Sequence, residues 1–68
     1  MSALESYESR LTSTLAALQA ALAVEMSLHQ ALRANPHDGA VRGELGVAVR
    51  ATAAAFEAWR RESTEGWR

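Results

Sequence analysis

The residues best suited to chemistry are Glu25 and His29, which lie four positions apart. On a helix that spacing puts both side chains on one face, where they can form a hydrogen bond or half of a metal site. A complete site needs a third group, and Glu44 is the nearest candidate. Bundles that bind two metal ions place a glutamate three residues before its histidine on several helices, whereas here the spacing is four and occurs once. We therefore interpret Glu25 and His29 as a structural pair at the solvent-exposed end of a helix–helix contact, without a metal.

No other motif indicates catalysis or a cofactor. The serines and threonines have no neighbouring base in a strained turn, and the four glycines are scattered rather than gathered into a phosphate-binding loop. Two arginines and two tryptophans near the C-terminus could stack on bases, but three nearby glutamates neutralise them. These residues are Trp59, Arg60, Arg61 and Trp67, with Glu57, Glu62 and Glu65. The sequence predicts a protein that is not an enzyme and binds no cofactor, metal or nucleic acid.

Length and composition predict one small domain. At 68 residues the chain is near the lower limit for folding unaided, and without cysteine it can form neither a disulfide nor a thiolate metal site. Its net charge of −1 gives no long-range attraction to nucleic acid or anionic lipid. The apolar run 15–26 follows more acidic than basic residues, unlike a secretion signal, and Gln19 and Glu25 interrupt it. We expect a soluble, cytoplasmic protein with no membrane-spanning segment.

The elements that position these residues are two helices. Helix-forming Ala, Leu, Glu, Gln and Arg dominate both sides of the break at Asn35–Gly39, where Pro36 disfavours helix at the preceding residue and Asp38 suits a cap. We expect a helix over residues 3–33, begun by Ser2 as a cap, a turn over 34–39, a helix over 39–63 and a tail over 64–68. Helices of roughly 45 and 37 Å joined by a short turn favour an antiparallel hairpin with coiled-coil-like packing, an all-α fold.

Placing the residues about 100° apart predicts which helix faces meet. The predicted first-helix face contains Leu4, Tyr7, Leu11, Leu15, Leu18, Leu22, Met26 and His29. The predicted second-helix face contains Val41, Leu45, Ala48, Thr52, Ala55, Phe56 and Trp59. Folding the chain about His37 sets large residues of one helix opposite small residues of the other, as interdigitated packing requires.

Each helix also has a second apolar stripe that the hairpin does not cover. The stripes are Ala17, Ala21, Val24, Leu28 and Ala31 on the first helix, and Val47, Ala51, Ala54 and Ala58 on the second. Alanine alone could reflect helix propensity on an exposed surface, but Val24, Leu28 and Val47 favour a docking surface. We expect these stripes to bind a helical partner or a second copy and so complete a helical bundle.

The whole chain resembles the small E component of type III secretion needle chaperones, the YscE and PscE type. The similarity lies in its length, its opening Met1-Ser2-Ala3-Leu4-Glu5, the polar break and the alanine-rich second helix, together with the leucines Leu11, Leu15, Leu18 and Leu22. Trp59 and Trp67 depart from that pattern. The resemblance implies that this chain forms a cytoplasmic complex with a tetratricopeptide-like chaperone. Together the two proteins would keep the needle subunit from polymerising before export.

Two functional hypotheses follow. The first is a co-chaperone or adaptor that docks onto and stabilises a helical chaperone, indirectly acting on the needle subunit. The second is a self-assembling structural or regulatory protein, a homodimer that forms a four-helix bundle. A DNA-binding role is not supported, because a helix-turn-helix needs a third helix and a positive face.

Overall fold

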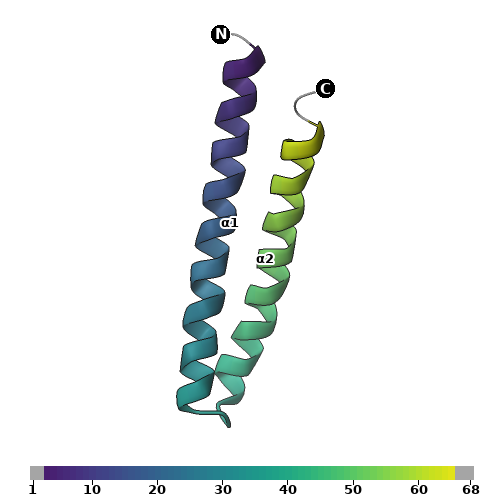
Figure 1. The fold of residues 1–68 in the computed structure, drawn as a ribbon. Helices are drawn as coiled ribbons and strands as arrows, with labels where there is room; N and C mark the ends of the chain where they lie inside the picture. The colour runs from purple at the N-terminus through teal and green to yellow at the C-terminus, as the bar shows by residue number, and fades with distance from the viewer. Residues whose placement is uncertain (1–2, 66–68) are drawn as a thin grey trace.

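A computed structural model describes residues 3–65 of the chain, with side chains over residues 6–64. Helix α1 spans Ala3–Ala34 and helix α2 spans Gly39–Glu65, and these residues include no strand. The helices run antiparallel and side by side, so the start of α1 and the end of α2 lie at one end of the molecule (Figure 1). The predicted all-α hairpin is confirmed. Residues 64 and 65 continue α2 rather than beginning a tail, and Ser2 and Trp67 lie outside the described residues.

Asp38 sets the start of α2. Its Oδ1 accepts hydrogen bonds from the backbone N–H groups of Ala40 at 3.1 Å and Val41 at 3.2 Å. These bonds satisfy donors that the first turn of a helix leaves without a partner. Behind the cap, the Arg42 guanidinium donates to the Pro36 carbonyl at 2.7 Å, which ties the turn to α2. Gly39 needs no unusual backbone angle, since no glycine among the described residues has a positive φ.

The contact between the helices is long and thin. The Cα atoms extend over 51 × 14 × 12 Å, and among the described residues only the hydrophobic residues Leu18 and Ala48 are buried, neither of them completely. Most of the half-buried and buried residues recur alternately three and four positions apart on both helices, the pattern of an antiparallel coiled coil. We call them the seam: Leu11, Thr14, Leu18, Ala21, Glu25, Leu28 and Leu32 of α1, and Val41, Leu45, Ala48, Thr52, Ala55, Trp59 and Glu62 of α2.

Polar residues enter the seam without an unsatisfied group. The Thr14 hydroxyl donates to the carbonyl oxygens of Arg10 and Leu11, and the Thr52 hydroxyl donates to that of Ala48 at 3.0 Å. Bonding of this kind within one helix lets a short hydroxyl side chain face a neighbour. No buried side-chain nitrogen or oxygen of the described residues lacks a hydrogen-bond partner.

The predicted contact face of α1 is wrong for about half of its residues. The structure leaves Leu15, Leu22 and Met26 exposed, together with His29, and turns Ala21 and Leu28 of the predicted docking stripe toward the seam instead. The residues of the predicted face repeat every 11 positions, or three turns. A stripe with that repeat turns slowly around α1 and does not stay aligned with α2 along the whole contact. Helices that stay in contact over a long distance supercoil to the left and need the shorter seven-residue repeat. On α2 only the exposed Phe56 departs from the predicted face.

The helix segment Ser6–Ala34 is long and apolar enough to cross a membrane, judged by length and composition alone. One such helix near the N-terminus is weak support for a membrane protein, because a signal sequence passes the same test. A helix with several apolar faces also has this composition when neighbouring helices cover those faces. The expectation of a soluble protein therefore remains a proposal.

Candidate functional site

Glu25 and His29 form the predicted pair and no larger cluster. The Glu25 Oε2 lies 3.4 Å from the His29 Nε2, and the Glu25 side chain is only 22% exposed because it faces the seam. Glu44, the candidate third group, does not join them, and the described residues contain no set of three or more His, Cys, Asp or Glu that could hold a metal ion. The geometry is that of a side-chain contact between successive turns of one helix.

Of the arginines near the C-terminus, Arg60 pairs with a glutamate, whereas Arg61 forms no ion pair within the described residues. Arg60 donates two hydrogen bonds to the Glu57 carboxylate, one of them from its Nε at 3.3 Å. The hydrogen bond and charge of Arg60 hold the pKa of the Glu57 carboxyl below its ordinary value. Glu62 pairs with Arg10 of α1 at 3.1 Å, so it links the two helices near the chain ends. Trp59 is half-buried in the seam.

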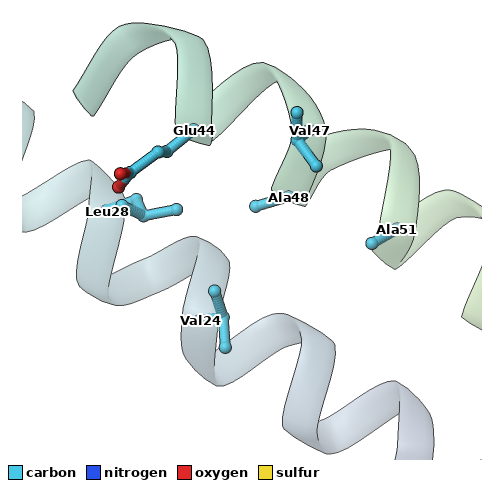
Figure 2. Close-up of a pocket in the computed structure, with 6 residues that line it drawn as sticks. All are labelled: Val24, Leu28, Glu44, Val47, Ala48 and Ala51. Atoms are coloured by element: carbon cyan, nitrogen blue, oxygen red, sulfur yellow. The ribbon is translucent and has the colours of Figure 1, made fainter. Parts of the chain in front are cut away.

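An apolar groove lies between the two helices. Its volume is about 420 Å³, and its walls are almost wholly apolar. Val24 and Leu28 form the α1 side, and Val47, Ala48 and Ala51 form the α2 side, with the Glu44 side chain extending toward α1 at one end (Figure 2). Val24 is 55% exposed and Val47 is 59% exposed, so their side chains lie open to a ligand.

The structure brings the two predicted docking stripes together on this one side of the hairpin. Val24, Leu28, Val47 and Ala51 line the groove, and Ala17, Ala54 and Ala58 are exposed along the same helix faces toward the chain ends. Ala21 is half-buried where the stripe meets the seam. We call this side the groove face: Ala17, Ala21, Val24, Leu28, Val47, Ala51, Ala54 and Ala58.

A second apolar surface escaped prediction because its α1 residues were assigned to the helix contact. Positions two apart on a helix point about 200° away from each other, so Val49 lies on the side of α2 opposite Val47. We call this the opposite flank, and its large exposed side chains are Leu15, Leu22, Met26, Val49 and Phe56. Phe56 packs on Trp59 with ring centroids 6.0 Å apart, which partly covers it. The heptad spacing of the seam is the signal that separates this flank from the contact face.

Comparison with known proteins assigns the chain to no family. No protein-family model, curated protein or solved structure matches the chain. The groove face and the area it exposes are therefore the basis of the functional proposal.

Proposed function

We propose that this chain is a small cytoplasmic co-chaperone or adaptor that binds and stabilises a helical, tetratricopeptide-like chaperone through its groove face. In its most specific form, the proposal places the complex on the type III secretion needle subunit before export, as the resemblance of the sequence implies. The general form, a hairpin that docks onto another helical protein, depends only on the surface described above.

The observation that supports the proposal is the excess of exposed surface. A folded monomer of 7.3 kDa exposes about 4,200 Å² by the usual dependence of surface on mass. This chain exposes 5026 Å². The excess is roughly 850 Å², close to the ~800 Å² that each partner contributes to a standard protein interface. Because the groove within this surface is apolar, the hairpin gains stability when another protein covers it.

The shape and chemistry of the groove face favour a helix as the ligand. Two adjacent helices leave a furrow between them, and small residues along its rim let a third helix approach closely. Repeat proteins built from helix pairs use the same packing between neighbouring units, and their terminal helices expose an apolar face that needs a cover. The apolar walls provide affinity, whereas Glu44 at one end provides a polar contact that can orient the helix.

Co-expression with the tetratricopeptide-like chaperone of a needle subunit tests this function, with light scattering after gel filtration as the readout. We expect a stable complex with the unaltered chain. Val47→Arg places a charge in the apolar groove and should weaken binding about 100-fold, since burial of an unpaired charge costs several kcal/mol. Val49→Arg is the matched control, because it makes the same change on the opposite flank and should alter binding less than threefold.

Two results would contradict the proposal. One is a complex that Val47→Arg leaves intact, because the groove face would then not be the contact. The other is a chain that melts at high temperature by itself and gains no stability when the chaperone is added. Helicity measured by circular dichroism shows whether each variant retains the hairpin.

A further inference from the structure

The groove face of α2 is complementary to itself when it is read in the opposite direction. Six positions spaced by three, four, three, four and three residues follow one side of the helix: Glu44, Val47, Ala51, Ala54, Ala58 and Arg61. In an antiparallel pair of α2 helices centred between Ala51 and Ala54, Val47 of each copy meets Ala58 of the other. A large side chain then faces a small one at the outer apolar positions, and alanines meet at the centre, as close helix packing requires.

The charges at the two ends of this stripe match in the same arrangement. Glu44 and Arg61 are equally far from its centre, so each glutamate of one copy meets the arginine of the other. Both residues are exposed along α2, and neither forms an ion pair within the described residues of the single chain. Opposite charges at the two ends of the stripe favour this antiparallel register of the two α2 helices. In most other registers, Glu44 and Arg61 would face uncharged or like-charged residues.

Helix α1 supports the same centre independently. Two contacts fix the register of α1 against α2. Arg10 pairs with Glu62, and Leu28 lies beside Glu44 in the groove. By that register the centre of the α2 stripe is level, within one residue, with the point midway between Ala17 and Val24 of α1. A two-fold axis at this level therefore sets Val24 of one copy opposite Ala17 of the other, again a large residue against a small one.

We propose that a second copy of this chain binds the groove face about this two-fold axis and forms a four-helix bundle with its two turns at opposite ends. The side of the hairpin that contains the groove face measures 51 × 14 Å between Cα atoms over the whole molecule, which is on the order of 700 Å² before side chains extend it. That approaches the area each partner buries in a standard interface. The inference does not depend on the proposed chaperone function, although both complexes use the groove face and exclude each other.

Sedimentation equilibrium of the full chain at low salt tests the dimer and its register. We expect the unaltered chain to form a dimer. Glu44→Arg and Arg61→Glu each replace two attractive contacts with repulsive ones, and each should weaken self-association roughly tenfold. When the two variants are mixed, the introduced arginine of one variant meets the introduced glutamate of the other, and the unaltered Arg61 of the first meets the unaltered Glu44 of the second. A mixed dimer should therefore form with about the original affinity.

A second pair of variants tests the centre of the contact. Ala54→Glu brings carboxylates together near the two-fold axis and should weaken the dimer about 100-fold. Ala53→Glu, its neighbour on the opposite flank, should leave the dimer unchanged. A chain that stays monomeric, single reversals that associate like the original, or a mixture that associates no better than its components would each overturn the inference. Circular dichroism of every sample verifies that the hairpin has folded. The mixture of Glu44→Arg and Arg61→Glu is a further control, because it restores the contact between residues 44 and 61 without any new substitution.

Discussion

The position of Glu25 in the seam makes Glu25→Leu the most informative single substitution. A carboxylate occupies a seam position of α1 whose neighbours along the heptad are Ala21 and Leu28, while Leu22 and Met26 lie exposed beside it. Because α1 turns this position toward α2, a leucine there becomes part of the helix contact. We therefore expect Glu25→Leu to stabilise the hairpin.

The size of the effect follows from the burial of the site. The Glu25 side chain is 22% exposed, so a leucine there would bury most of its surface, a gain of about 1–2 kcal/mol. The substitution also removes the contact with His29, and side-chain pairs at this spacing on one helix are worth about 0.3–0.5 kcal/mol. Helix propensity changes little, because glutamate and leucine are both good helix formers. The net gain in unfolding free energy is about 1 kcal/mol, which raises the Tm by about 4–8 °C in a domain of this size.

Thermal unfolding followed by far-ultraviolet circular dichroism measures this shift, at one protein concentration for all variants because association also raises the Tm. Gln30→Leu is the matched control, since Gln30 is exposed on α1 and the added leucine gains little burial. An equal rise in both variants, or a fall in Glu25→Leu, would refute the orientation of α1. In that case the face predicted from the sequence, with Leu22 and Met26 against α2, would be the better description.

Three further predictions concern single contacts. Leu18→Ala removes the most buried leucine of the described residues and should lower the unfolding free energy by about 2 kcal/mol in urea titrations, whereas the same change at the exposed Leu15 should cost less than half of that. Asp38→Ala removes both cap hydrogen bonds and should cost about 1 kcal/mol, while Asp38→Asn should retain most of the stability; equal losses would contradict the cap. Because Arg60 lowers the pKa of Glu57, the contribution of this pair is complete above the unfolded-state pKa of Glu57 and is lost as the pH falls through its lower folded-state pKa. An NMR titration should show the pKa of Glu57 rising in Arg60→Gln, and an unchanged value would contradict the pairing.

Local chemistry made much of this structure predictable. Pro36 and Asp38 mark the break because proline restricts the residue before it and aspartate accepts hydrogen bonds from the first turn of a helix. The predicted pairing of Glu25 with His29 needed only their spacing on one helix. The contact face of α2 was also predictable, since its apolar residues are concentrated on one side.

The contact face of α1 could not be predicted from periodicity. Leu15 and Leu18 are both apolar and lie on neighbouring sides of the helix, and so do Leu22 and Leu28. Several rotations of α1 would therefore bury similar amounts of apolar surface, each with a different set of side chains. Only contact with α2 along the full length selects the seven-residue repeat, because helices in continuous contact coil around each other. That choice placed Glu25 in the seam and left Met26 exposed.

Residue types and their spacing within a single helix were enough to specify the two helices, the capped turn and a surplus of apolar side chains. The packing of the helices against each other selected which of those side chains face α2, and it joined Val24 of α1 and Val47 of α2 in one groove. The physical reason is that a groove is made by two helices together. Its position depends on their relative rotation and register, which short-range preferences along either helix do not specify.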